Sequence, residues 1–202
     1  MWSAFLALKY RVFSAIYEPL EDLLDRFNTW EGTPWQFKGN FRPTDKETHQ
    51  QITAIDLTFG QIPHDIKGVY LRNGPNAQLQ SRTNRQHLFD GDAMVHALRF
   101  DGKKIEYCNR QLRTPKFVQE NEEYGRPIYF KVGELPGIRI WDSVKRSLNA
   151  LKISLIHTAQ FIGVKPYLPL EKDGTMNTAL VHHNKKTFAL LECKLPFGIK
   201  VN

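Results

Sequence analysis

The sequence predicts a mainly β protein of antiparallel meanders, with helices at the N-terminus and one amphipathic helix inserted between the strands. Two hairpins with the same plan occupy residues 94–112 and 178–192. Both alternate apolar and polar side chains and are bounded by Gly, Asn or Asp turns, which is typical of half-buried strands. Repeated meanders of about four strands indicate β-propeller blades of roughly 40 to 45 residues. The strands of this chain would suffice for about two blades.

Residues 1–36 are predicted to be a helical segment that precedes a strand-rich domain at residues 37–202. Apolar residues recur at helical spacing between Phe5 and Ile16. Pro19 is expected to open a second helix, because proline is tolerated in the first turn of a helix and not in its interior. The apolar side of this second helix consists of Leu20, Leu23, Leu24 and Phe27.

Residues 37–63 contain scattered proline and glycine and are predicted to form a long irregular connection. A short strand at 69–72 should follow, stopped by Asn73-Gly74-Pro75-Asn76. The Asp90-Gly91-Asp92 turn should then lead into a strand at 94–100, and Asp101-Gly102 should return it as a strand at 105–112. The second hairpin is predicted at 178–183 and 187–192 around Asn184-Lys185, with a third strand at 195–201.

Residues 139–163 have the pattern of an amphipathic helix with aromatic and cationic residues among its apolar ones. One interpretation is a helix that packs its apolar stripe on the sheet. The other is a helix at a membrane interface, where Trp, Lys and Arg are favoured. The candidate membrane-interface residues are Ile140, Trp141, Val144, Leu148, Leu151 and Leu155.

The net charge of +7 comes from dispersed basic pairs, which are typical of solvated turns. No stacking platform or recognition helix accompanies them, so we expect no nucleic-acid partner. No stretch is long and apolar enough for a membrane span, and the N-terminal charge order differs from a secretory signal. Cys108 and Cys193 are predicted to be buried or half-buried free thiols of a reducing compartment. We therefore expect a cytoplasmic protein, peripherally associated with a membrane.

The histidines offer few metal sites. His182 and His183 are neighbours on a predicted strand, so their side chains should point to opposite faces. Only His87, Asp90, Asp92 and His96 cluster in a way that could mimic a two-histidine, one-carboxylate iron site. Because Asp90 and Asp92 flank a turn glycine, we expect them to bond backbone amides instead. Nucleophile and phosphate-loop motifs are absent.

Five motifs resemble the carotenoid cleavage dioxygenases and occur in the order of that family. They are GNFRP at 39–43, IPHDIKGVYLRNGPN at 62–76, FDGDAMVHALRF at 89–100, NRQLRT at 109–114 and NTALVHHNKKTFALLE at 177–192. The resemblance covers about residues 37–202. It implies a seven-bladed β-propeller, of which this chain would hold a part, with Fe(2+) held on the axis by four histidines. Such enzymes insert molecular oxygen across a polyene double bond and take lipophilic substrate through an apolar patch, to which residues 139–163 would belong.

The resemblance carries over one residue near the metal. Glu192 matches a glutamate whose carboxylate accepts a hydrogen bond from an iron-bound imidazole. His96 matches a histidine that is not a ligand, and Ala93 stands where the family has a second turn glycine. The four ligand histidines should lie beyond Asn202, so we expect a fragment without catalytic residues or direct metal ligands, inactive alone and without bound iron. The alternative is a non-catalytic lipid-surface or carotenoid-binding module.

Overall fold

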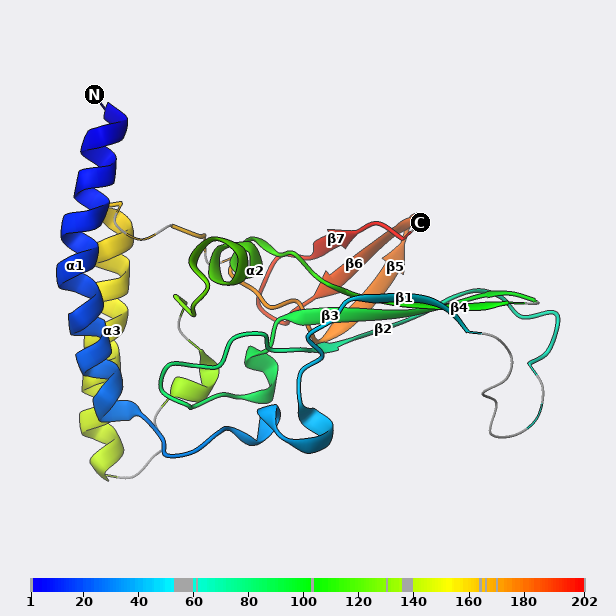
Figure 1. Ribbon diagram of the computed structural model, residues 1–202, viewed down its shortest axis with the longest axis horizontal. Coiled ribbons are helices and arrows are strands. Elements are labelled where there is room, and N and C mark those ends of the chain that lie inside the picture. Colours follow the sequence, from blue (N-terminus) through cyan, green and yellow to red (C-terminus); the bar gives the residue numbers. More distant parts are fainter. Residues whose placement is uncertain are drawn as a thin grey trace.

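The computed structural model places two antiparallel sheets beside a pair of long helices (Figure 1). It describes residues 2–52, 60, 62–102, 104–129, 131–135, 140–163, 165, 167–169 and 171–201. Within these ranges, residues 2–14, 50–52 and 140–143 are described by their backbone alone. The two sheets agree with the predicted mainly β class, and the helices lie at the opposite end of the molecule from the strand tips.

The first sheet has the strand order β1-β4-β3-β2. β1 spans Thr48–Ile52, β2 Lys67–Pro75, β3 Ala93–Asp101 and β4 Ile105–Gln111. β3 and β4 form the predicted hairpin, in which Phe100 pairs with Ile105 and Gly102 supplies the positive φ of +87° at the turn. β1 lies in the stretch that the sequence predicted to be irregular, so that prediction was wrong. Its residues alternate weakly in polarity, and its place is set by pairing with β4 from Thr48 to Ile52.

The second sheet has the order β5-β6-β7. β5 spans Ala179–His183, β6 Lys186–Leu190 and β7 Phe197–Ile199. β5 and β6 are slightly shorter than predicted, and β7 is less than half as long as the predicted strand at 195–201. Asn184 and Lys185 both have positive φ, +47° and +60°. Two positive φ values in a two-residue turn match the right-handed twist of the flanking strands. The predicted hairpin at this turn is therefore confirmed.

A small apolar core lies between the two sheets. It joins Ala93, Val95 and Leu112 of the first sheet region to Met176 and Ala189 of the second, all of them buried. Half-buried side chains surround it on both sides, namely Leu71, Leu180, Leu191, Phe197 and Ile199. The sheets are thus joined by a few apolar side chains, which leaves much of the linkage to hydrogen bonds.

Two long helices run antiparallel along each other, α1 at Trp2–Asn28 and α3 at Ile140–Phe161 (Figure 1). α3 packs mainly on α1 and not on a sheet, contrary to one of the two interpretations above. Shorter helices connect the elements: η1 Trp35–Phe37, η2 Gly39–Phe41, η4 Leu88–Asp90, α2 Pro115–Phe117, the π-helix η5 Val118–Tyr124 and η6 Val132–Glu134. Among the described helices, none has the length and apolar character to cross a bilayer.

Two predicted boundaries were wrong. Pro19 lies inside α1, which continues through it. A proline inside a helix costs about 3 kcal/mol, but ion pairs hold the helix on both sides of it, through Glu18 to Arg126 and through Glu21 to Arg82. The strand at 69–72 does not stop at Asn73, because β2 continues to Pro75. Pro75 is its last residue, where the missing N–H interrupts no further ladder.

The face of α1 that meets α3 and the loop at 80–87 is ionic. Lys152 of α3 contacts Asp25 of α1 at 2.5 Å and Glu134 at 3.1 Å, and all three side chains are buried. Arg82 contacts Asp25 and Glu21 at 3.2 Å, and Lys165 contacts Glu21 at 2.6 Å. Burial raises the pKa of Asp25 despite the bond from Lys152, whereas Glu134 and Asp25 outweigh burial and raise the pKa of Lys152. Burial therefore opposes the charged forms of Asp25 and Lys152, and the ion pairs between them counteract this desolvation.

Removing one member of this network should destabilise the protein strongly. Lys152→Met would leave Asp25 and Glu134 buried without their cation, so we expect the free energy of unfolding to fall by about 3–5 kcal/mol. Urea denaturation of the variant and of the matched Lys172→Met control, whose side chain is exposed, measures the difference. Equal unfolding midpoints for the two variants would contradict this role.

Candidate functional site

The turn at 89–93 is organised by the carboxylate of Asp90. Asp90 is 4% exposed and accepts three backbone hydrogen bonds. The donors are the N–H groups of His87 at 2.7 Å, Val132 at 2.7 Å and Gly133 at 2.8 Å. An ionised acceptor makes each of these bonds stronger than a neutral one. Asp90 thus behaves as predicted for a turn acid, and it also reaches η6, which sequence spacing could not indicate.

The same turn is held from the other side by the second sheet region. The side-chain amide of Asn177 donates to the carbonyl oxygens of Phe89 at 2.9 Å and Gly91 at 2.5 Å. The backbone N–H of Ala93 donates to the carbonyl of Thr175 at 3.0 Å. Two of the motifs that carry the family resemblance, at 89–100 and at 177–192, therefore meet at this turn.

A third motif, at 62–76, converges on the same place. Asn73 donates from its side chain to the carbonyl of Met176 at 2.7 Å, and the N–H of Asn76 donates to the carbonyl of Asp92 at 2.7 Å. A Cβ on Gly91 would lie 3.0 Å from both the Ala77 nitrogen and the Pro75 Cβ, so glycine is needed here for close approach. These contacts bring three motifs that are separate in the sequence together at one turn.

The backbone at position 93 does not require a glycine. It begins β3, is fully buried, and does not have a positive φ. The nearby positive φ belongs to Met176, at +53°, which is uncommon for a residue with a Cβ. The backbone of Met176 is held by Asn73. Sequence reasoning could not have predicted the positive φ at Met176, because methionine is not a residue that favours it.

A buried charge cluster lies behind the turn and was missed by the sequence analysis. Lys116 contacts Glu120 at 2.7 Å and Asp92 at 3.4 Å, and all three side chains are almost fully buried. Burial opposes the charge of Lys116, but Asp92 and Glu120 outweigh it and raise its pKa. Burial lowers the pKa of the neighbouring Lys131. The i,i+4 spacing of Lys116 and Glu120 could have indicated the pair. The prediction that Asp92 bonds backbone amides was wrong, because the tertiary fold brings its carboxylate to Lys116.

The side chains of the candidate iron cluster at 87–96 make hydrogen bonds that stabilise the fold. His87 accepts from the N–H of Phe89 at 3.2 Å as a helix cap, and His96 contacts the hydroxyl of Tyr107 at 2.8 Å. Burial lowers the pKa of His96. His182 contacts Thr187 at 2.9 Å, and His183 is exposed. In the described part of the chain, no three His, Cys, Asp or Glu side chains are grouped so that they could hold a metal ion.

Glu192 lies in the turn just after β6, two residues beyond the last strand residue Leu190. Its side chain is exposed, and it makes no hydrogen bond or ion pair with the described residues. Its carboxylate is therefore unpaired within the described part of the chain. Cys193 beside it is exposed, contrary to prediction, and Cys108 is half-buried as predicted. Cys193 is exposed because it follows the strand end, in a turn on the outside of the second sheet.

The candidate membrane-interface residues are divided between exposed and half-buried positions. Val144 and Leu151 are 55% and 49% exposed, and Leu148 and Leu155 are half-buried. The side chains of Ile140 and Trp141 lie outside the described part of the chain. α1 adds a second exposed apolar stripe, made of Ile16, Leu20, Leu23 and Phe27. The helical pair thus buries ionic side chains together with Leu24, Ile156 and Ala159, and it leaves an apolar stripe of each helix exposed.

Residues 41–202 match the protein family described as retinal pigment epithelial membrane protein. The chain belongs to this family, which is shared by the carotenoid cleavage dioxygenases. Carotenoid 9,10(9',10')-cleavage dioxygenase 1 of Pisum sativum is 34% identical over 164 residues, 81% of this chain and 27% of that protein. The enzyme of the same name from Phaseolus vulgaris is 32% identical, over 93% of this chain and 32% of that protein.

Solved structures of the family have the same fold in the matching region. A variant of the Synechocystis apocarotenoid oxygenase aligns with a TM-score of 0.53 at 22% identity, over 78% of this chain and 28% of that chain. The lignostilbene dioxygenase of Pseudomonas brassicacearum aligns with a TM-score of 0.54 at 19% identity, over 84% of this chain and 30% of that chain. The chain thus spans about a third or less of the length of the curated relatives it matches.

Loss of the Asn177 amide should loosen the link between the two sheets. Asn177→Ala leaves the buried carbonyl of Gly91 without its side-chain donor and that of Phe89 with the Thr175 hydroxyl alone, and we expect stability to fall by about 1–3 kcal/mol. Chemical denaturation is the measurement, with Asn40→Ala as the control because Asn40 is exposed. If Asn177→Ala unfolds at the same denaturant concentration as Asn40→Ala, the amide does not anchor the turn.

Proposed function

We propose that these residues form the N-terminal part of a non-haem iron(II) dioxygenase that cleaves a carbon-carbon double bond of a carotenoid or apocarotenoid. Family membership supports oxidative cleavage of such a substrate. The observation that carries the proposal is the meeting of three family motifs at the Asp90 turn, with the uncommitted Glu192 carboxylate just beyond β6. The substrates would be a lipophilic polyene and molecular oxygen.

The two sheets would be parts of adjoining blades in a seven-bladed propeller. Their meander order and their face-to-face core support this arrangement. Residues 1–36 would be a helical segment attached to a propeller domain that begins near residue 37. In this arrangement the Asp90 turn sets the position of the second sheet, and with it the position of Glu192 at the end of β6.

Glu192 fits the role of orienting a metal-bound histidine. An exposed carboxylate without a partner can accept an N–H bond from an imidazole, which fixes the ring and raises its basicity as a ligand. The described residues supply no group of direct ligands. Iron would activate oxygen in the whole protein, and the histidines that hold it would come from outside the described residues. We propose that the 202 residues alone neither bind iron nor cleave a polyene.

Replacing Glu192 in the protein that contains all four histidines should weaken metal binding. Glu192→Gln is expected to lower iron affinity by about 10- to 100-fold, because outer partners of ligating histidines have effects of that size. Metal analysis after dialysis measures it, and aldehyde products report activity. Glu123→Gln is the matched control, since Glu123 is exposed in η5. Unchanged iron content in Glu192→Gln would refute the assignment.

The exposed stripes of α1 and α3 support a peripheral attachment to membranes. Two antiparallel helices with apolar outward faces would lie in the membrane interface and bring the protein to its lipophilic substrate. The same surface would serve the alternative function, a non-catalytic lipid-surface or carotenoid-binding module. The cytoplasmic location stays a prediction; a relative from Arabidopsis thaliana, 30% identical, is named a probable chloroplastic dioxygenase.

Charging this surface should release the protein from lipid. Val144→Glu with Leu151→Glu places two carboxylates at the interface, where we expect flotation with phosphatidylcholine vesicles to fall several-fold. The control is Ala150→Glu, an exposed position on the same helix that lies off the stripe. Equal flotation of the control and the double variant would rule out this surface as the attachment site.

A further inference from the structure

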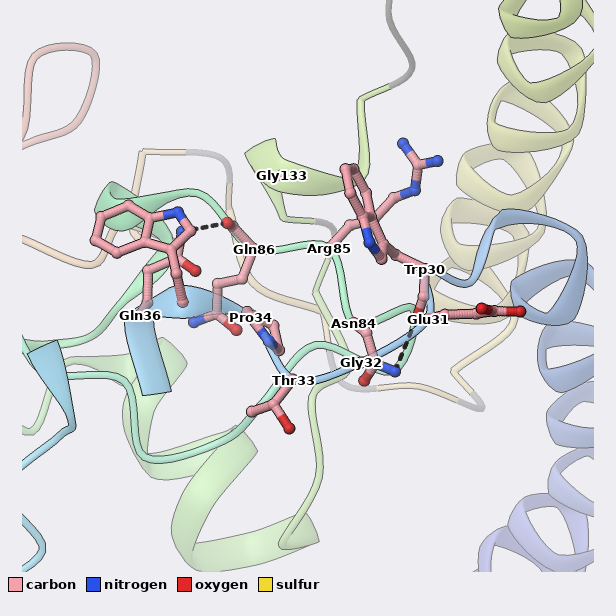
Figure 2. A pocket seen from close by; sticks show the side chains of 11 residues that line it. Trp30, Glu31, Gly32, Thr33, Pro34, Gln36, Asn84, Arg85, Gln86 and Gly133 are labelled. Atoms are coloured by element: carbon pink, nitrogen blue, oxygen red, sulfur yellow. Dashed lines mark hydrogen bonds between the residues drawn. The ribbon is translucent and has the colours of Figure 1, made fainter. Parts of the chain in front are cut away.

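A pocket of about 350 Å³ lies where the segment after α1 crosses the loop at 84–86 (Figure 2). Its walls are residues 30–36 on one side and 84–86 on the other, with Gly133 between them. Gly133 also donates its N–H to Asp90, so the pocket borders the Asp90 turn, whereas Glu192 does not line it. The volume is at the lower end of the range for small-molecule sites, so it would suit a ligand of about one ring.

The pocket is held open by hydrogen bonds between its two walls. The N–H of Trp30 donates to the Thr83 carbonyl at 2.8 Å, and the Asn84 amide donates to the Trp30 carbonyl at 3.0 Å. At the other end, the Gln36 amide donates to the Gln86 carbonyl at 2.6 Å. The bonds at Asn84 and Gln36 are drawn in Figure 2. A site fixed in this way needs little reordering when a ligand enters.

Two indole rings provide apolar surface in the pocket. Trp30 is 62% exposed and Trp35 is 52% exposed, which is unusual for such large side chains. The Arg85 guanidinium lies 5.6 Å from the centre of the Trp30 ring, and its Nε donates to the Asn28 carbonyl at 2.8 Å. Trp35 is held edge-on against Phe41 at 4.8 Å. Both rings are therefore positioned while much of their surface stays open to a ligand.

The polar groups of the pocket include an acceptor and a donor without partners. Gln36 is only 7% exposed, and its Oε1 has no hydrogen-bond partner. Leaving a buried acceptor unpaired costs about 1–3 kcal/mol, so it calls for a donor. The Oε1 of Gln86 accepts from the Ser81 N–H at 3.1 Å, which leaves its NH₂ group to donate into the pocket. Because the Gln36 Oε1 has almost no accessible surface, the Gln86 NH₂ group is the one left to bind a ligand hydroxyl, which can accept from it.

The charges of the pocket favour a neutral ligand. Arg85 already lies over Trp30, so it would repel a cation from the ring face. Glu31 and Arg85 both line the pocket, so their opposite charges together favour neither a cation nor an anion. The polarised C–H groups on the face of a sugar ring suit the negative face of an indole. We propose that this pocket binds one neutral hexose ring, either as a free glycoside or as the head group of a glycolipid.

The pocket lies directly after the end of α1, where Phe27 is exposed. A glycolipid bound there by its sugar could lay its acyl chains along the apolar stripe of α1. A free glycoside would use the ring contacts alone. The proposal does not depend on iron or on polyene cleavage, because it rests on Trp30, Trp35 and Gln86.

Titration of the 202-residue chain with methyl β-D-glucoside and methyl β-D-galactoside, followed by tryptophan fluorescence and calorimetry, tests the proposal. We expect saturable binding of one of them with a Kd of about 1 mM or tighter. Trp35→Ala should raise the Kd by about tenfold through loss of the stacking contact. Thr33→Phe should block the pocket without removing a buried contact, since Thr33 is exposed. Tyr167→Ala, which is exposed outside the pocket, is the control.

The source of the sugar is decided with vesicles of phosphatidylcholine, alone or with a monoglycosyl diacylglycerol. If flotation is stronger with the glycolipid, and this gain is lost in Thr33→Phe and kept in Tyr167→Ala, the ligand is the glycolipid head group. Glycoside binding without this preference assigns a free glycoside. No binding of either form, equal binding by Thr33→Phe and Tyr167→Ala, or saturation by choline or inorganic phosphate in place of the glycosides would overturn the proposal.

Discussion

The carboxylate of Asp90 is the constraint on which the other parts of the molecule depend. Through Val132 and Gly133 it fixes η6, whose Glu134 pairs with Lys152 of α3 and accepts from Ser81 at 2.8 Å. The carbonyls on either side of Asp90 hold Asn177, and so the second sheet. One buried acid therefore sets the relation between the first sheet, the second sheet and the helices.

Local patterns predicted the hairpins well, because Asp101-Gly102 and Asn184-Lys185 impose their turns without help from the rest of the chain. They did not predict β1, whose strand depends on its partner β4. Nor did they predict the continuity of α1 through Pro19, which is maintained by ion pairs to distant residues. Asp90 was correctly read as a turn acid, whereas Lys116, Lys131 and Asn177 acquire their surroundings only in the tertiary fold.

The helical pair departs most from expectation. Periodicity placed apolar residues on one side of each helix, and such a side usually faces the core. Here Glu21, Asp25 and Lys152 are buried, while Leu23 and Phe27 are exposed. A periodic pattern shows that a helix has two unlike faces, but it does not show which face meets the protein. Leu24 of α1 and Ile156 and Ala159 of α3 are buried beside these charges. The inward face of α1 was set by Arg82, Lys165 and Glu134, which lie far from α1 in sequence.

The distance between Asp25 and Lys152 along the chain, 127 residues, has a consequence during synthesis. At about 5–20 residues per second, translation needs roughly 6–25 s to deliver Lys152 after Asp25. For that time Asp25 of α1 lacks its lysine and has only Arg82 as a cation, and the side of α1 that will meet α3 is uncovered. The nascent helix is thus available to a chaperone or a lipid surface well before α3 is synthesised. Its first binding partner is therefore met during translation.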